Sequence, residues 1–216
     1  MRIGILGSGL MGGKLGALFA RAGHEVVFSY ARSPEKLAAL AREAGGRARP
    51  GTVAQAAREA DALLLAVRWS SLEDVLAQSG DLAGKLVVSC SLPMSEDDSE
   101  LVIAHTSSGA ESLAARLPDS SIVSAFGTVP SEVLFDVFAA RNRAVRPSLV
   151  YCGDDAAAKK TTARLINDVG FEPVDAGPLR IARYMEPFTM LIAQLAYEGS
   201  EGPELAYRLE RFASSG

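Results

Sequence analysis

The stretch Gly7-Ser8-Gly9-Leu10-Met11-Gly12 decides the fold of this chain. It follows the apolar run Ile3–Leu6 and opens a helical pattern of apolar residues that reaches Ala22. The pattern G-x-G-x-x-G therefore lies between a strand and a helix, which is the context that a dinucleotide-binding turn requires. The sequence predicts an α/β protein of the Rossmann type, with a doubly wound, mainly parallel sheet.

Each glycine of this turn has a physical role. Gly7 permits the tight turn, Gly9 lets the backbone approach a pyrophosphate, and Gly12 lets the helix pack closely on the strand. The free N–H groups and the dipole of the helix favour an anion at its N-terminus. We expect the whole turn, including Ser8, Leu10 and Met11, to bind the coenzyme. The alternative is a glycine-rich turn without a ligand.

Length and composition indicate one globular unit. The chain has 216 residues and a net charge of −4, so we expect a single domain over 1–216, with 179–216 as a helical C-terminal extension. The negative charge argues against binding to nucleic acid. No apolar run approaches the ~20 residues that span a bilayer, and the N-terminus does not read as a signal peptide. We expect a cytoplasmic protein with no membrane association.

The end of the second predicted strand, Glu25–Tyr30, indicates which dinucleotide binds. NAD-binding forms of the fold carry an acidic residue about 20 residues after the glycines, which accepts hydrogen bonds from the ribose. This chain has Ser29, Arg32 and Ser33 there instead. A guanidinium can bind a 2′-phosphate that a carboxylate would repel. We predict NADP(H), bound by these three residues with help from Lys36; alternatively Arg32 is a solvated loop charge and Ser33 a helix cap.

The alternation of strands and helices continues along the chain. Helices are expected from Ser33 and from Thr52, where Gln55 completes a capping box, with a short strand at 47–49 between them. The apolar run Ala62–Val67 predicts a central strand covered on both faces. Its end places Ala66, Val67 and Arg68 beside the coenzyme. Ser70 and Glu73 are expected to cap the next helix, and the strand at 85–90 leads to Ser91.

The second half of the chain is less regular. We predict a helix at 109–117, a strand at 122–126, a helix from about 131, a strand at 148–153, a helix at 155–169 and a last strand at 172–174. From Leu179 the apolar residues follow one long amphipathic helix, and a further helix is expected at 204–212. Met185, Phe188, Leu191, Ile192 and Leu195 give the long helix a broad apolar face. That face predicts a two-fold homodimer, unless the helix folds onto its own sheet.

The sequence offers little acid–base or metal chemistry. It has no G-x-S-x-G or H-E-x-x-H pattern, and Cys90 and Cys152 form no C-x-x-C pair, so we expect no metal site and no disulfide. His24 precedes the second strand and reads as structural, and His105 as an ordinary surface residue. We therefore assign no residue as acid or base, which fits direct hydride transfer to a conjugated acceptor.

Several segments together resemble the NADPH-dependent coenzyme F-420 (deazaflavin) reductases, also called F-420-dependent NADP oxidoreductases. Beside the glycine turn, they are Ser29–Arg32, Ala66–Trp69, Ser124–Val129, Asp175–Leu179 and Glu186-Pro187. The resemblance implies that C-terminal helices complete an acceptor pocket and that the protein is a homodimer. It also matches Ser29 and Arg32 to the family's 2′-phosphate contacts. A similar module forms the NADPH-binding part of membrane ferric reductases.

The acceptor follows from this resemblance and from hydride chemistry. We expect a planar ring, coenzyme F-420 first and a flavin second, to lie between Phe126, Gly127 and Thr128 and the helix that bears Met185 and Glu186. Arg68, Leu92 and Gly127 stand where the family usually has Pro, Asn and Asn. The amide side chains that are missing at Leu92 and Gly127 could orient a polar ring in the family. Other functions therefore stay open. The protein could reduce a flavin, ferric iron or a carbonyl with NADPH, or it could be a non-catalytic NADP(H) sensor.

Overall fold

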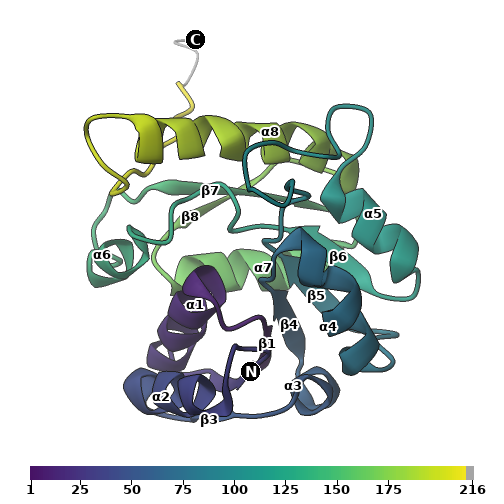
Figure 1. Cartoon of the computed structure of the whole chain (residues 1–216). Helices are drawn as coiled ribbons and strands as arrows, with labels where there is room; N and C mark the ends of the chain where they lie inside the picture. Colours follow the sequence, from purple (N-terminus) through teal and green to yellow (C-terminus); the bar gives the residue numbers. More distant parts are fainter. Residues whose placement is uncertain (213–216) are drawn as a thin grey trace.

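The computed structural model describes residues 1–212 and shows an α/β protein built around one eight-stranded sheet (Figure 1). The strands are β1 (Arg2–Leu6), β2 (Glu25–Ser29), β3 (Ala48–Pro50), β4 (Ala62–Leu65), β5 (Leu86–Ser89), β6 (Ser121–Ser124), β7 (Ser148–Gly153) and β8 (Glu172–Asp175). Their order in the sheet is β3-β2-β1-β4-β5-β6-β7-β8. The first six follow the Rossmann order, and only the β6–β7 pair is antiparallel. The predicted fold class is confirmed.

Helices cover both faces of this sheet. They are α1 (Leu10–Arg21), α2 (Pro34–Ala44), α3 (Val53–Glu59), α4 (Leu72–Ser79), α5 (Gly109–Arg116), α6 (Leu134–Ala139), α7 (Ala156–Asp168) and α8 (Ala182–Ala193), with short 3₁₀ turns at Trp69–Ser71 and Leu179–Ile181 and a π-helical turn at Gln194–Glu198. Strand β4 is buried throughout. Its Leu64 packs on the side of α1 and α7, and Leu63 on the side of α3 and α4. A central strand covered on both faces was the prediction for this run.

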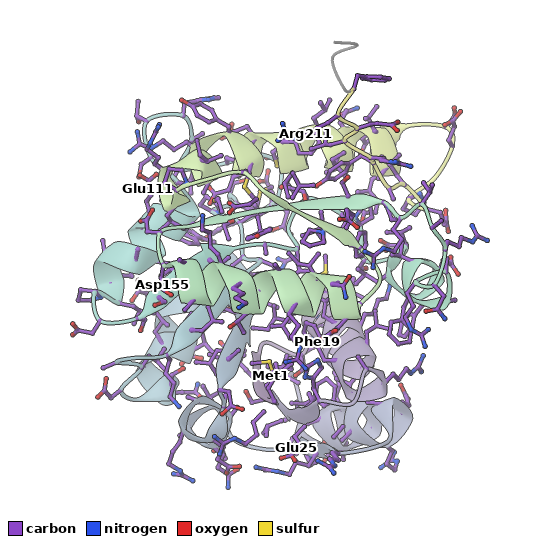
Figure 2. The ribbon with its side chains drawn as sticks, turned by 180° about the vertical axis from the view of Figure 1, so that it is seen from behind. Met1, Phe19, Glu25, Glu111, Asp155 and Arg211 are labelled. Atoms are coloured by element: carbon purple, nitrogen blue, oxygen red, sulfur yellow. The ribbon has the colours of Figure 1, made fainter. Side chains whose placement is uncertain are left out.

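Side-chain capping explains where several of the helices begin. The Ser33 hydroxyl accepts from the Lys36 N–H at 3.3 Å, and Thr52 and Gln55 form the predicted capping box. Asp155 caps α7, which crosses one face of the sheet in Figure 2. The prediction for α4 was wrong: it begins at Leu72 after a 3₁₀ turn, and neither Ser70 nor Glu73 caps it. The 3₁₀ turn uses residues that the capping pattern had assigned to the helix entry.

The C-terminal segment differs most from expectation. The helix predicted at 204–212 is absent, and residues 203–212 form irregular chain. Their backbone groups bond to β7 instead: Ser148 N–H donates to the Tyr207 carbonyl at 2.8 Å, and Leu209 N–H donates to the Ser148 hydroxyl at 2.9 Å. Because β7 runs antiparallel to β6 and pairs only through Cys152 and Gly153, its first residues extend past β6 and leave an edge for this segment. The helical extension therefore ends at Glu198.

Two smaller differences complete the comparison. The third strand lies at Ala48–Pro50, one residue later than predicted, and α6 begins three residues after Ser131.

The apolar face of α8 is divided: Met185 and Ile192 are buried on the protein's own core, whereas Leu191 and Leu195 are 53% and 52% exposed. Within residues 1–212 no helix is long and apolar enough to cross a membrane.

Candidate functional site

The glycine turn has the geometry that a bound pyrophosphate needs. Gly7 has φ +108°, and a Cβ added there would lie 2.4 Å from the Ala66 carbonyl oxygen. A Cβ on Gly12 would lie 1.9 Å from the Gly7 carbonyl oxygen, so α1 can approach β1 only with glycine at this position. A Cβ on Gly9 would meet no atom within 4 Å. The space beside Gly9 is therefore open, as a phosphate cradle requires.

No side chain caps the N-terminus of α1, which is where such an anion would bind. Gly9 is its N-cap residue and makes no side-chain cap, and no acidic residue lies in the first turn. Gly9 and Leu10 are exposed, whereas Ser8 is buried. The Ser8 hydroxyl donates to the Ser29 carbonyl at 2.8 Å, and its N–H donates to the Tyr30 carbonyl at 3.0 Å. These bonds fix the turn against the end of β2.

At the end of β2, one predicted phosphate-binding side chain is exposed and another is buried. Arg32 is exposed, and no ion pair involves it among residues 1–212. Lys36 is exposed one turn further on, in the first turn of α2. Ser29 does not fit its predicted role, because its side chain is fully buried and its hydroxyl donates to the Ile5 carbonyl at 2.7 Å. The hydroxyl of Ser29 ties β2 to β1.

Tyr30 is the residue that sequence reasoning left without a role here. It takes φ +55°, an uncommon value for a bulky side chain, and its hydroxyl donates to the Asp74 carboxylate at 2.7 Å. That bond joins the end of β2 to α4 across the carboxyl edge of the sheet. The position of Tyr30 directly after the second strand was the available signal.

The ends of β4 and β5 are joined by a serine. The Ser91 hydroxyl accepts from the Val67 N–H at 3.1 Å, and Ser91 is buried. Ala66 and Val67 lie directly beside the turn, since a Cβ on Gly7 would contact both residues. Arg68 is exposed and forms an ion pair of 2.5 Å with Asp98 in the long loop before α5. The guanidinium of Arg68 is thus paired with the acidic loop and does not stand unpaired beside the glycine turn.

The predicted acceptor residues do come together, around a cavity between the carboxyl ends of β5 and β6 and the helix α8. Its volume is about 10 Å³, room for about one water molecule, and it is lined by Ser89, Cys90, Ser91, Leu92, Ser124, Gly127, Thr128, Met185, Glu186 and Thr189. Phe126, which was also predicted for this pocket, does not line it: the side chain is fully buried in the core against Phe19, with ring centroids 6.1 Å apart, and the backbone has φ +66°. Strained backbone of this kind gathers at functional sites. Most ligand pockets are larger, about 300–1,000 Å³.

Glu186 is the acidic residue that lines this cavity. Its side chain is 2% exposed, and its two oxygens accept from the N–H groups of Gly109 at 2.8 Å and Ala110 at 3.0 Å. Burial raises the pKa of Glu186 to about 7, although both hydrogen bonds oppose the shift. The carboxyl group therefore exchanges a proton near neutral pH. The sequence predicted Glu186 in the acceptor pocket, but not as an acid or base.

The two threonines that line the cavity are hydrogen-bonded: the Thr189 hydroxyl donates to the Met185 carbonyl at 3.1 Å, and Thr128 bonds to Tyr207. The hydroxyl groups of Thr128 and Tyr207 share a hydrogen bond of 2.8 Å, and the Val150 N–H donates to the Tyr207 hydroxyl at 3.1 Å. Burial raises the pKa of the Cys90 thiol to about 12, so Cys90 carries no thiolate at neutral pH. Tyr207 does not itself line the cavity, but its hydroxyl binds the C-terminal segment to Thr128, which does.

The two histidines and Cys152 lie outside the cavity, whereas Cys90 lines it. His24 is buried and bonds to Asp168 at 3.0 Å, beside the amino end of β2, and burial lowers its pKa. His105 is exposed in the loop before α5. Cys152 is buried under α8 as a free thiol. Among residues 1–212 no group of three or more metal-ligating side chains occurs.

The strand order, the glycine turn and the open N-terminus of α1 define a Rossmann-type dinucleotide fold, the fold of NADP-dependent oxidoreductases. Residues 2–93 match the family described as "NADP oxidoreductase coenzyme F420-dependent". The match, which covers β1 to β5, supports the family that the sequence resembles.

Two solved structures and one curated relative extend the comparison. A candidate F420-dependent NADP reductase from Arthrobacter sp. FB24 is 24% identical, with a TM-score of 0.84 over 97% of this chain and 99% of that one. The protein SMa0349 from Sinorhizobium meliloti is also 24% identical, with a TM-score of 0.73 over 97% and 96% of the two chains. Metalloreductase STEAP3 from Rattus norvegicus is 29% identical over 185 residues. That alignment covers 86% of this chain, which spans about a third of the relative's length.

Proposed function

We propose that this protein binds NADP(H) at the carboxyl edge of its sheet and transfers hydride between the coenzyme and a planar acceptor, with coenzyme F-420 first and a flavin second. The observation that carries the proposal is the spacing at the glycine turn: Gly7 and Gly12 exclude any side chain, while the space beside Gly9 is open. The family matched by residues 2–93 supports the choice of NADP.

The residues of the turn have separate tasks in this proposal. The backbone from Ser8 to Gly12 receives the pyrophosphate at the N-terminus of α1, where N–H groups and the helix dipole favour an anion. Arg32 receives the 2′-phosphate, with Ser33 and Lys36 near the start of α2. Ala66, Val67 and Ser91 carry the coenzyme along the ends of β4 and β5. The coenzyme supplies the hydride.

The acceptor ring is proposed to lie against Gly127, Thr128, Met185 and Glu186. The cavity volume of about 10 Å³ is far less than such a ring needs. The ring therefore enters only when α8 or the segment bearing Tyr207 moves outward. A position between two packed elements excludes water, which protects a hydride donor from side reactions.

Leu92 and Gly127 line this cavity where the family usually has amide side chains. Their lack of hydrogen-bonding groups favours an acceptor with less polar edges than F-420, and so keeps a flavin as the second candidate. Ferric iron, which the name metalloreductase suggests for STEAP3, has no cluster of ligating side chains within residues 1–212.

We further propose that the exposed outer face of α8 is covered in a homodimer. Tyr184, Leu191 and Leu195 are each more than half exposed on one side of this helix. Their spacing of seven and four residues places them along one stripe. Scattering at micromolar protein should give the mass of a dimer, and the mass of a monomer would remove this part of the proposal.

One experiment tests the central activity. NADPH and NADH are titrated into the protein, and oxidation of the bound coenzyme is followed with F-420, FMN and a ferric chelate in turn. We expect NADPH to bind more tightly and F-420 to be reduced fastest. Tight NADPH binding with no oxidation by any of the three acceptors would favour a non-catalytic NADP(H) sensor.

A further inference from the structure

We propose that Glu186 holds the proton that the acceptor takes up together with the hydride, so that the reaction is a coupled hydride and proton transfer. This inference rests on the proposed function. It changes the sequence-based expectation that the site uses no acid or base.

The position of Glu186 carries the argument. Glu186 lines the cavity between β5, β6 and α8, together with Thr128, Cys90 and Ser91. It is the ionisable carboxyl group among the residues that line this cavity. Its location places an exchangeable proton where a bound ring would contact it. Water has little access to the same point, because Glu186 is 2% exposed.

The hydrogen bonds of Glu186 suit a group that alternates between acid and carboxylate. Each oxygen accepts one backbone N–H at the start of α5, from Gly109 and from Ala110. A carboxyl oxygen has two lone-pair sites, so one oxygen can carry a proton toward the cavity while the N–H contacts remain. After the proton leaves, the same two N–H groups and the dipole of α5 stabilise the carboxylate.

The chemistry of the step balances with this proton. The acceptor gains a C–H bond and an electron pair from the hydride of NADPH, and the reduced ring bears a negative charge. The O–H bond of Glu186 breaks, and its proton forms an N–H or O–H bond on the ring. NADP⁺, a neutral reduced acceptor and the Glu186 carboxylate result. Solvent returns a proton to Glu186 when the cavity opens for product release.

The charged groups around Glu186 are consistent with a pKa near neutral pH. Glu111 on α5 has the same sign and raises the pKa of Glu186, but its carboxylate is bound to Arg183 of α8 through contacts of 2.7–3.1 Å. Cys90 after β5 and Cys152 on β7 are uncharged thiols, because burial raises the pKa of each to about 12. Burial is the largest cause of the raised pKa of Glu186, which is about 7.

The test compares Glu186→Gln with Glu111→Gln as the matched control. Glu111 lies at the same end of α5 and pairs with Arg183, but it does not line the cavity. Single-turnover rates are measured from pH 5.5 to 9 with NADPH and F-420. In the wild type and in Glu111→Gln we expect the rate to fall about tenfold per pH unit above about 7. In Glu186→Gln we expect a rate about 10²-fold lower and independent of pH, with NADPH affinity unchanged.

The outcomes separate the two proposals. If the wild type oxidises no NADPH, the proposed function fails. If the wild type is active and Glu186→Gln keeps the wild-type pH profile, only the role of Glu186 fails. Loss of the pH limb in Glu111→Gln as well would assign the limb to the ion pair with Arg183 and overturn the inference.

A second measurement covers a variant that does not fold, because glutamine offers only one acceptor to the two N–H groups. Infrared difference spectra of the wild-type protein are recorded as bound NADPH is oxidised, with glutamate labelled by ¹³C at the carboxyl carbon. We expect loss of a protonated carboxyl band in step with hydride transfer. An unchanged carboxyl band during oxidation would overturn the inference without any substitution.

Discussion

The two halves of the site are built in different ways. The coenzyme half is one short turn, Gly7 to Gly12, whose geometry is set by backbone and by the absence of side chains. The acceptor half brings together the ends of β5 and β6, the start of α5, the helix α8 and Tyr207 near the C-terminus. The first half is rigid because it has no room to change. The second is held by individual hydrogen bonds, so its specificity can change one residue at a time.

The largest effect should come from the coenzyme half. Gly12→Ala places a Cβ 1.9 Å from the Gly7 carbonyl oxygen, so α1 must move away from β1. We expect a loss of about 3 kcal/mol or more in the free energy of unfolding, and loss of NADPH binding. Gly9→Ala is the control, because its Cβ meets no protein atom. Chemical unfolding should show Gly9→Ala near wild type, while NADPH titration shows weakened binding. Equal stability of the two variants would contradict the tight packing at Gly12.

The acceptor half should show its largest effect in the pH dependence of stability. The pKa of Glu186 rises from 4.5 to about 7 on folding, so the unfolded state releases this proton first. The resulting stability is fully present below pH 4.5 and is lost as pH rises through about 7. The raised pKa corresponds to about 3 kcal/mol.

Urea unfolding from pH 4.5 to 8 measures this effect in the wild type and in Glu186→Gln. The difference in the free energy of unfolding between the two proteins should shrink as pH rises, because glutamine does not titrate. His24, whose lowered pKa acts in the opposite direction, contributes equally to both and cancels. A difference that stays constant across this range would show that Glu186 titrates normally.

The coenzyme half should also show a smaller, charge-dependent effect. Arg32→Ala removes one charge-assisted contact with the 2′-phosphate, about 1.5–3 kcal/mol, so NADPH should bind roughly tenfold more weakly or worse. NADH lacks this phosphate and should be much less affected. Fluorescence titration with both coenzymes gives the two affinities, and a matched Lys36→Ala should have a weaker effect. Equal losses of NADPH and NADH affinity would reject Arg32 as the phosphate contact.

The smallest effect is expected at the C-terminal segment. Tyr207→Phe removes a hydroxyl that bonds to Thr128 and to the Val150 N–H, at a cost of about 1–2 kcal/mol in stability. Affinity for NADPH should not change, because Tyr207 lies in the acceptor half. Turnover with F-420 should change, since Tyr207 holds the hydroxyl of Thr128, which lines the cavity. A variant with reduced NADPH affinity and unaltered turnover would break the division into two halves.

The difference between the halves also explains what the sequence could predict. The glycine turn, the central strand and the caps at Ser33, Thr52 and Asp155 depend on neighbouring residues, and a local pattern records them. The absence of a helix at 204–212 could not be predicted locally. That segment bonds to the free edge of β7, which exists only because β6 is shorter.

Two side chains at the site show the same limit. Ser29 has the right place in the sequence for a phosphate contact, but its hydroxyl is turned into the sheet toward Ile5. Glu186 was placed in the pocket by its resemblance to a family pattern, yet its raised pKa depends on burial and on the start of α5, which lies 77 residues earlier in the chain. Orientation and proton affinity follow from packing, which no local pattern records.

The central claim is that hydride passes directly from NADPH, bound at the glycine turn, to a ring in the cavity beside Glu186. NADPH carrying deuterium at C4 of the nicotinamide, on one face at a time, is mixed with the protein and F-420, and the reduced acceptor is analysed by mass spectrometry. We predict one deuterium per reduced acceptor from one face only and none from the other. Oxidation of NADPH with no deuterium in the acceptor would contradict direct transfer.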